Sequence, residues 1–122
     1  MEELYFEKYD KSTYGWQIKD FFYLLYNDGL FETAVREILK KNDYSIDYTQ
    51  CIFSENAVYE GEDFFEGVEF EMGSLSDDSE IYVSEKECLF FIRDAVCSYE
   101  KRKPNRKGFA DKFFEETKLR CD

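Results

Sequence analysis

Carboxylates are the side chains of this sequence with the most evident chemistry. Twelve of them lie between residues 55 and 87, where Lys86 is the one basic residue, so this segment carries 1 − 12 = −11 of the chain's formal charge of −12. The rest of the chain is nearly neutral, with 16 − 1 = 15 basic and 28 − 12 = 16 acidic residues. Carboxylates in such number can work as acid–base pairs, hold a hard cation such as Ca²⁺, or attract a basic partner.

The first two of these uses find little support. No two carboxylates stand out as a catalytic pair, and Asp77, Asp78 and Glu80 lack the D-x-D-x-D-G spacing of an EF-hand loop. The sequence has no histidine, which excludes Ser-His-Asp and Cys-His mechanisms and H-E-x-x-H zinc sites. Neither a Walker A pattern nor G-x-G-x-x-G is present. We therefore predict no enzyme activity, no catalytic residue, no metal site and no cofactor.

The third use depends on how the acids are displayed. Residues 64–72 alternate acidic and apolar side chains, and successive side chains of a strand point to opposite faces. Val68, Phe70 and Met72 would then face a core, whereas Glu69 and Glu71 would face outward. Two interpretations stay open for such a face. It is either ordinary solvated surface or a docking face for a basic partner, which would offset the self-repulsion of the acids.

Two helices are expected to precede this strand. The first would run from Tyr14 to Asn27 with Ser12 or Thr13 as its cap, and the second from Leu30 to Lys41. Both show the i, i+3, i+4, i+7 spacing of a buried stripe, which in the first helix consists of Ile18, Phe21, Phe22 and Leu25. Asp28-Gly29 separates the helices, so we expect a helical hairpin.

Three strands are predicted around the acidic residues: Tyr44–Phe53, Phe64–Met72 and Glu80–Val83. Gly67, inside the second of these, indicates a bulge or a close backbone approach. Leu4-Tyr5-Phe6 is a candidate for a fourth strand or a packed arm. The expected sheet is therefore an antiparallel meander of three to four strands.

Two helices are expected after the sheet. Ser84 and Glu87 form the capping-box pattern for a helix that runs to about Arg102, and Pro104 prevents its continuation. A last helix, 105–119, would bury Phe109, Phe113 and Leu119. The segment 98–122 holds eight basic and five acidic residues, and we interpret this excess as balancing the acidic sheet rather than as binding nucleic acid.

Length and composition predict one α+β domain over residues 1–122. Aromatic residues make up 20% of the chain, too many for a disordered acidic tail. The chain opens Met1-Glu2-Glu3 without the basic and apolar regions of an export signal, and its longest apolar run, 21–26, is too short to span a bilayer. We therefore expect a cytoplasmic protein that binds no membrane.

The cysteines support the same expectation. Cys51, Cys88, Cys97 and Cys121 form no C-x-x-C pair. Cytosolic thiols are usually reduced, and free cysteines often pack as small hydrophobic residues. We therefore expect four free thiols.

Three stretches resemble a known family. They are Phe-Phe-Glu-Gly-Val-Glu-Phe at 64–70, Glu-Ile-Tyr-Val-Ser at 80–84, and a helix with Glu-Cys-Leu-Phe-Phe at 87–91 that ends in 99–104. Together they resemble the immunity proteins of bacterial contact-dependent growth inhibition (CDI) systems, specifically those paired with ribonuclease toxins. The resemblance covers about a third of the chain. It implies a protein that binds and neutralises the C-terminal nuclease domain of a cognate toxin, one to one, with its own oligomeric state left open.

The charge pattern agrees with that implication. A ribonuclease binds a polyanion through a basic cleft, and an acidic face is the complement of such a cleft. The acids that we predict to contact the partner are Glu60, Glu62, Asp63, Glu66, Glu69, Glu71, Asp77, Asp78 and Glu80. Three aromatic residues, Tyr59, Phe65 and Tyr82, are predicted anchors. The alternatives are a nucleic-acid mimic that blocks a DNA-binding protein and a small acidic enzyme. In each non-enzymatic case the chain would bind no nucleic acid directly.

Overall fold

The structure is a computed structural model that describes residues 14–47, 49–57, 66–73 and 79–121. Its elements, in chain order, are α1 (Trp16–Asn27), α2 (Phe31–Leu39), β1 (Tyr44–Ile46), β2 (Thr49–Phe53), α3 (Ser54–Ala57), β3 (Val68–Met72), β4 (Ser79–Val83), α4 (Glu85–Arg102), the 3₁₀ turn η2 (Pro104–Arg106) and α5 (Lys107–Thr117). None of the helices in the described ranges is long and apolar enough to cross a membrane.

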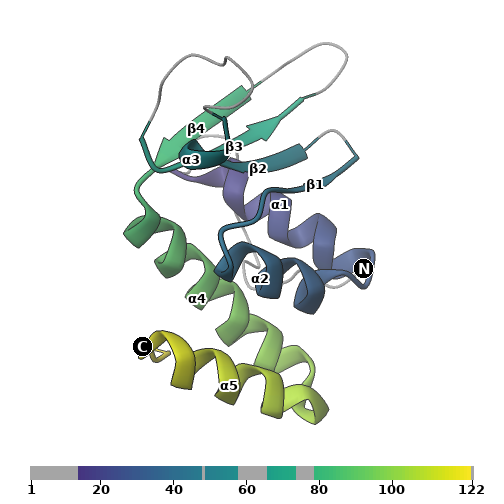
Figure 1. Cartoon of the computed structure of the whole chain (residues 1–122). Helices are drawn as coiled ribbons and strands as arrows, with labels where there is room; N and C mark the ends of the chain where they lie inside the picture. Colours follow the sequence, from purple (N-terminus) through teal and green to yellow (C-terminus); the bar gives the residue numbers. More distant parts are fainter. Residues whose placement is uncertain (1–13, 48, 58–65, 74–78, 122) are drawn as a thin grey trace.

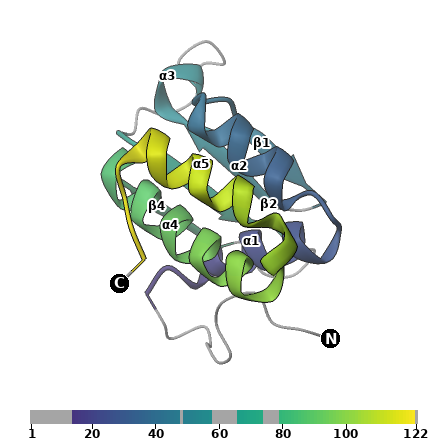
Figure 2. The ribbon, with the colours of Figure 1, turned by 90° about the horizontal axis from the view of Figure 1, so that it is seen from below.

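The four strands form one antiparallel sheet in the order β1-β2-β3-β4, and the long helices lie on one side of it (Figure 1). Helix α1 packs directly against β3 and β4, and α4 packs against α1. Seen from below, α5 lies across α4 and beside α2, at the end of the molecule away from the sheet (Figure 2). The predicted α+β architecture is confirmed.

The core lies between the sheet and α1. Val68 and Phe70 are 0% and 1% exposed, and the ring of Phe70 lies 5.5 Å from that of Phe21 and 6.4 Å from that of Phe22. Burial of aromatic and aliphatic area of this kind is the main favourable contribution to folding. Because Val68 and Phe70 alternate with Glu69, the packing also fixes which way the acids of β3 point.

The predicted strand Tyr44–Phe53 is wrong as a single element. The structure divides it into β1 and β2, which turn back on each other around Asp47, a residue with a φ of 51°. Aspartate tolerates this left-handed conformation better than most residues. The Thr49 hydroxyl also donates a 2.9 Å hydrogen bond to the Ile46 carbonyl across the turn. The fourth strand therefore comes from this hairpin, and Leu4–Phe6 lies outside the described residues.

The N-terminus of α1 differs from its prediction, whereas that of α4 agrees with it. The predicted cap of α1 at Ser12 or Thr13 is wrong. The residue that precedes the helix is Gly15, which has no side chain to cap it. The predicted capping box of α4 is confirmed. The Glu87 amide donates to the Ser84 hydroxyl at 3.0 Å, and the Ser84 amide donates to the Glu87 carboxylate at 3.4 Å.

Gly67 makes the close backbone approach that its position predicts, although it stands just before β3 rather than inside it. Its φ is 88°, and a Cβ at this position would lie 2.1 Å from the Val83 carbonyl oxygen. Its own carbonyl accepts a 3.0 Å hydrogen bond from the Ser54 amide. Glycine therefore allows β3 to enter the sheet close to the end of β4.

The last helix, α5, is shorter than the predicted helix 105–119. It begins at Lys107, because η2 takes up residues 104–106, and it ends at Thr117. Phe113 is buried as expected, whereas Phe109 and Leu119 are only partly buried against the core.

The expectation of four free thiols is also wrong. Cys97 and Cys121 form a disulfide with a Cα–Cα distance of 5.8 Å, which ties the end of the described chain to α4. Cys51 and Cys88 are free and buried, as predicted. The pairing depends on the return of α5 along α4, which cysteine spacing in the sequence does not reveal.

Candidate partner-binding face

The side of the sheet that points away from α1 carries the candidate site, which we call the outer sheet face. Strand register places two rows across it: Ser45, Gln50, Glu71 and Glu80 in one, and Ile52, Glu69 and Tyr82 in the other. The long helices α1, α2, α4 and α5 all lie on the other side of the sheet (Figure 1). The acids of this face are therefore held by the sheet itself.

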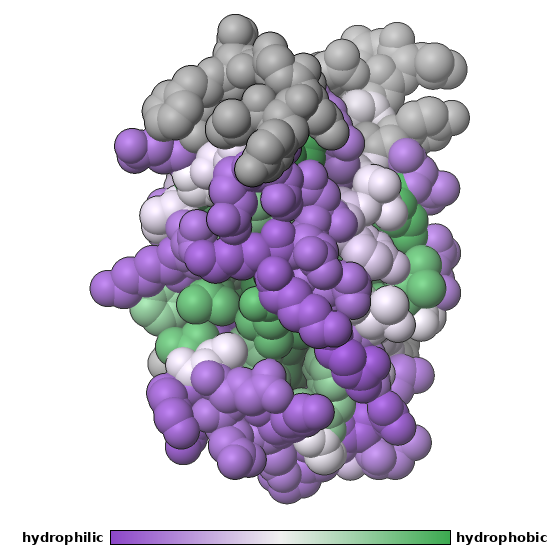
Figure 3. All heavy atoms as spheres, viewed as in Figure 1, coloured by the Kyte–Doolittle hydropathy of each residue, from purple (hydrophilic) through white to green (hydrophobic). Residues whose placement is uncertain are grey.

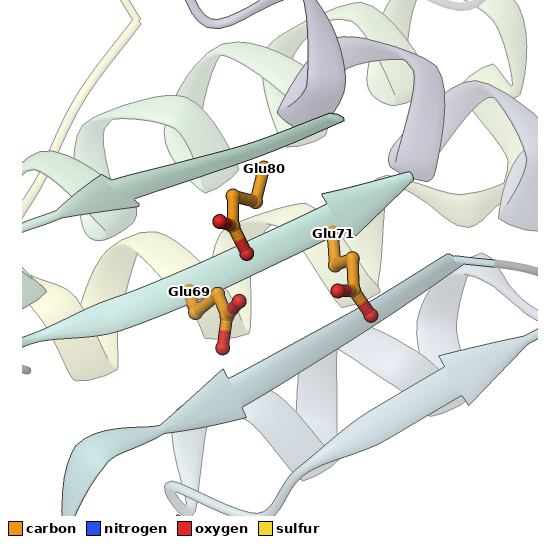
Figure 4. Close-up of side chains that lie close together, drawn as sticks. All are labelled: Glu69, Glu71 and Glu80. Atoms are coloured by element: carbon orange, nitrogen blue, oxygen red, sulfur yellow. The ribbon is translucent and has the colours of Figure 1, made fainter. Parts of the chain in front are cut away.

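Three carboxylates converge on this face. Glu69 and Glu71 of β3 and Glu80 of β4 each place a carboxylate oxygen so that the three atoms lie within 4.8 Å of one another (Figure 4). Glu71 is opposite Glu80 in the strand register, and the Gln50 side-chain amide donates a hydrogen bond to it. Glu69 and Glu71 are half-buried, and Glu80 is exposed. The cluster is therefore accessible, but water screens it only in part.

Crowding changes the acidity of the cluster. The pKa of Glu69 is raised to about 7, first by desolvation, then by a hydrogen bond to Glu80 and by the negative charges of Glu80 and Glu71. Near neutral pH, Glu69 is therefore protonated in a large fraction of the molecules. In that form it can donate a hydrogen bond to Glu80 instead of repelling it.

Tyr82 is the exposed aromatic residue of the face, with 48% of its surface accessible. Its pKa is raised to about 12, first by desolvation and then by the negative charges of Glu69 and Glu80. The phenol is therefore neutral at physiological pH and lies beside the carboxylates. An aromatic side chain next to charged groups is a common arrangement at protein interfaces.

The structure describes five of the twelve predicted contact residues. Glu69, Glu71, Glu80 and Tyr82 share the outer sheet face, and Glu66 is exposed just before β3. The other seven lie outside the described residues: Tyr59, Glu60, Glu62, Asp63, Phe65, Asp77 and Asp78. Gln50 and Ile52 belong to the face but were not predicted. The alternation of buried and half-buried side chains in β2 places them on this face. The sequence does not show that β2 pairs with the acidic strand β3.

Chemically, the face suits binding better than catalysis. Its described polar groups are three carboxylates, one amide, one phenol and the hydroxyl of Ser45, which together can accept hydrogen bonds from several ammonium or guanidinium groups. The fold and this face thus define an α+β protein that presents an acidic surface to a partner.

Comparison with known proteins identifies the family. Residues 14–114 match the CDI immunity protein family CdiI_4, and the chain belongs to that family. The fold is similar to that of an immunity protein from Neisseria meningitidis MC58, with a TM-score of 0.64 and 9% sequence identity over 82% of this chain and 85% of that one. No curated protein matches the chain. The protein is therefore a toxin inhibitor and not an enzyme.

Proposed function

We propose that this immunity protein acts in the cytoplasm and neutralises a ribonuclease, the C-terminal nuclease domain of its cognate CDI toxin. In this proposal the outer sheet face covers the basic cleft where the toxin would bind RNA. The observation that carries the proposal is the convergence of Glu69, Glu71 and Glu80 within 4.8 Å on a face that the long helices leave uncovered.

The carboxylate cluster has an electrostatic cost in the free protein. Partial burial and like charges held together both destabilise ionised carboxylates in the free protein, and the pKa of Glu69 is raised first by desolvation and then by its acidic neighbours. Lysine and arginine side chains of a nuclease cleft would bring positive charge to the same place. The unfavourable interaction in the free protein would then become a favourable one in the complex.

Charge and packing have different parts in this proposal. Complementary charge mainly raises the association rate and selects the partner, whereas well-packed aromatic and apolar side chains slow dissociation. Tyr82 projects beside the carboxylates, and Ile52 lies next to Glu69 in the register. We propose Tyr82 as the anchor among the described residues, and Tyr59 and Phe65 stay predictions. One-to-one stoichiometry and a single domain also stay predictions.

The test is inhibition of RNA cleavage by the purified toxin domain. The unmodified protein should abolish cleavage at one equivalent, whereas Glu69→Lys/Glu71→Lys should require a large excess. The matched control is Asp28→Lys/Glu115→Lys, which changes the net charge equally at exposed positions away from the outer sheet face and should inhibit like the unmodified protein.

Two results would contradict the proposal. One is full inhibition by the Glu69→Lys/Glu71→Lys variant, which would remove the outer sheet face from the mechanism. The other is equal inhibition of unrelated DNA-binding proteins by the unmodified chain, which would favour a general nucleic-acid mimic.

A further inference from the structure

A second surface with the opposite character lies between α2 and α5. It is a groove of about 340 Å³ whose floor is formed by Val35 and Leu39 of α2 and by Phe109 and Phe113 of α5. A band of apolar atoms reaches the surface between these helices, with hydrophilic atoms on either side (Figure 3). We call this surface the α2–α5 groove.

The border of the α2–α5 groove is basic. Arg36, Lys40 and Lys112 line it together with the single acid Glu116, so the charges that line it sum to 3 − 1 = +2 in a chain of −12. The Arg36 guanidinium lies 5.5 Å from the centre of the Phe109 ring and 3.2 Å from the Glu32 carboxylate. The Lys40 ammonium lies 3.7 Å from the Glu37 carboxylate, and its side chain is 69% exposed. The groove thus combines an apolar floor with exposed cations, and a second copy would share Lys40 with Glu37.

These features are complementary to the outer sheet face. That face presents Tyr82 beside three carboxylates, so an aromatic side chain is flanked by negative charge. The groove presents an apolar hollow flanked by positive charge. We propose that the α2–α5 groove receives the outer sheet face of a second copy of this chain, with Tyr82 directed into the groove and the carboxylates paired with Lys40 and Lys112.

The positions of the two surfaces determine the kind of assembly. Helix α5 lies at the end of the molecule opposite the sheet (Figures 1 and 2). One copy cannot bring both surfaces together by itself, and the contact between two copies uses a different surface on each. Such head-to-tail contacts leave one groove and one face unoccupied in every dimer, so larger assemblies form as concentration rises.

Salt should act on this association in two ways. Two copies of net charge −12 repel each other at long range, whereas the proposed pairs attract at contact. The screening length is about 10 Å at 0.1 M and about 3 Å at 1 M ionic strength. Moderate salt should therefore reduce the long-range repulsion, and high salt should weaken the contact pairs as well. Association should be strongest at intermediate ionic strength.

Self-association through the outer sheet face should compete with toxin binding, and this consequence alone rests on the proposed function. A single outer sheet face cannot contact a toxin and a second copy at the same time. Addition of toxin should therefore convert assemblies into complexes that contain one immunity protein each.

The experiment is sedimentation velocity of the full chain from micromolar to millimolar concentration at about 0.15 M salt, where exposed charges are screened over about 8 Å. The unmodified protein should associate as concentration rises. Lys40→Glu/Lys112→Glu should raise the concentration needed about tenfold or more, because it removes the groove's cations and leaves Glu37 and Glu116 to repel the carboxylates of a second copy. Lys86→Glu/Lys101→Glu makes the same charge change at exposed positions of α4 and should associate like the unmodified protein.

A charge exchange makes the test specific. Glu69→Lys/Glu71→Lys alone should also fail to associate, but an equimolar mixture with Lys40→Glu/Lys112→Glu should associate again, because each variant supplies the charge that the other needs. A monomeric unmodified protein at every concentration, or a mixture that stays monomeric, would overturn the proposal. So would a groove variant that associates normally but no longer binds toxin, since the groove would then belong to the toxin interface. Lys40→Glu/Lys112→Glu changes exposed side chains only. It therefore tests the proposal even if Glu69→Lys/Glu71→Lys fails to fold.

Discussion

Glu69 of β3 and Glu80 of β4 are diagonal neighbours in the strand register, and their carboxyl groups converge closely enough to share a hydrogen bond, which requires a proton on one of them (Figure 4). Glu71 lies close enough to add its negative charge to the pair. Folding therefore places Glu69, a carboxyl group with its pKa raised to about 7, at the centre of the outer sheet face.

The raised pKa of Glu69 should make the stability of the fold depend on pH. The pKa of Glu69 is about 7 in the folded protein and near 4.5 when unfolded, so the folded state binds more protons between these values. The contribution of Glu69 to stability is therefore present below about pH 4.5 and is lost as pH rises through 7. We expect Glu69→Gln to raise Tm at pH 8 and to change it little at pH 5. Thermal melts at both pH values, with Glu66→Gln as an exposed control, would check this. An equal change at both pH values would contradict the raised pKa.

Toxin binding should release protons. Cations from the partner would favour the ionised form of Glu69, so its pKa should fall in the complex. At pH 7, where about half of the Glu69 side chains are protonated, binding should release up to half a proton per complex. Calorimetry in phosphate and in Tris, whose ionisation enthalpies differ, would measure this number. Glu69→Gln should abolish the difference between buffers, and identical enthalpies for the unmodified protein would contradict the coupling.

The start of α4 should contribute measurable stability. Ser84→Ala removes the hydroxyl that accepts from the Glu87 amide and should destabilise the fold by about 0.5–2 kcal/mol. Chemical unfolding would measure the change, and Ser45→Ala on the exposed side of β1 provides a control of the same chemistry. Toxin affinity of Ser84→Ala at a temperature where this variant is folded should not change. Equal stability of the two variants would show that the cap contributes nothing.

The disulfide should stabilise the fold through the unfolded state. The bond between Cys97 and Cys121 spans 24 residues of sequence, and closing a loop of that size contributes about 3 kcal/mol in the chain-entropy description. Chemical unfolding should show a loss of this order in Cys97→Ser/Cys121→Ser. The denatured, unreduced protein should expose two thiols, those of Cys51 and Cys88. Four thiols would contradict the bond.

Local patterns in the sequence predicted much of the fold. The capping box of Ser84 and Glu87 was found at its predicted place because both partners lie within one helical turn. The outward direction of Glu69 and Glu71 followed from alternation with Val68 and Phe70, which the core requires to be buried. In both cases the physical constraint acts between residues close in sequence.

Local sequence patterns do not predict contacts between residues that are far apart in the sequence. Acid-rich sequence indicated a charged surface, but the meeting of Glu69 with Glu80 depends on the register of β3 against β4. The turn at Asp47 depends on a left-handed backbone that residue types around it did not indicate. The α2–α5 groove likewise arises only when α5 packs beside α2.

The association rate of the toxin nuclease domain tests the central claim most directly. Stopped-flow measurements of the unmodified protein and of Glu69→Lys/Glu71→Lys, from low to high salt, would report the contribution of the outer sheet face. We predict an association rate for the unmodified protein that falls steeply as salt rises, and a rate for the variant that is at least about tenfold lower at low salt and nearly independent of salt. Equal rates with the same salt dependence would contradict the claim that the toxin binds at this face.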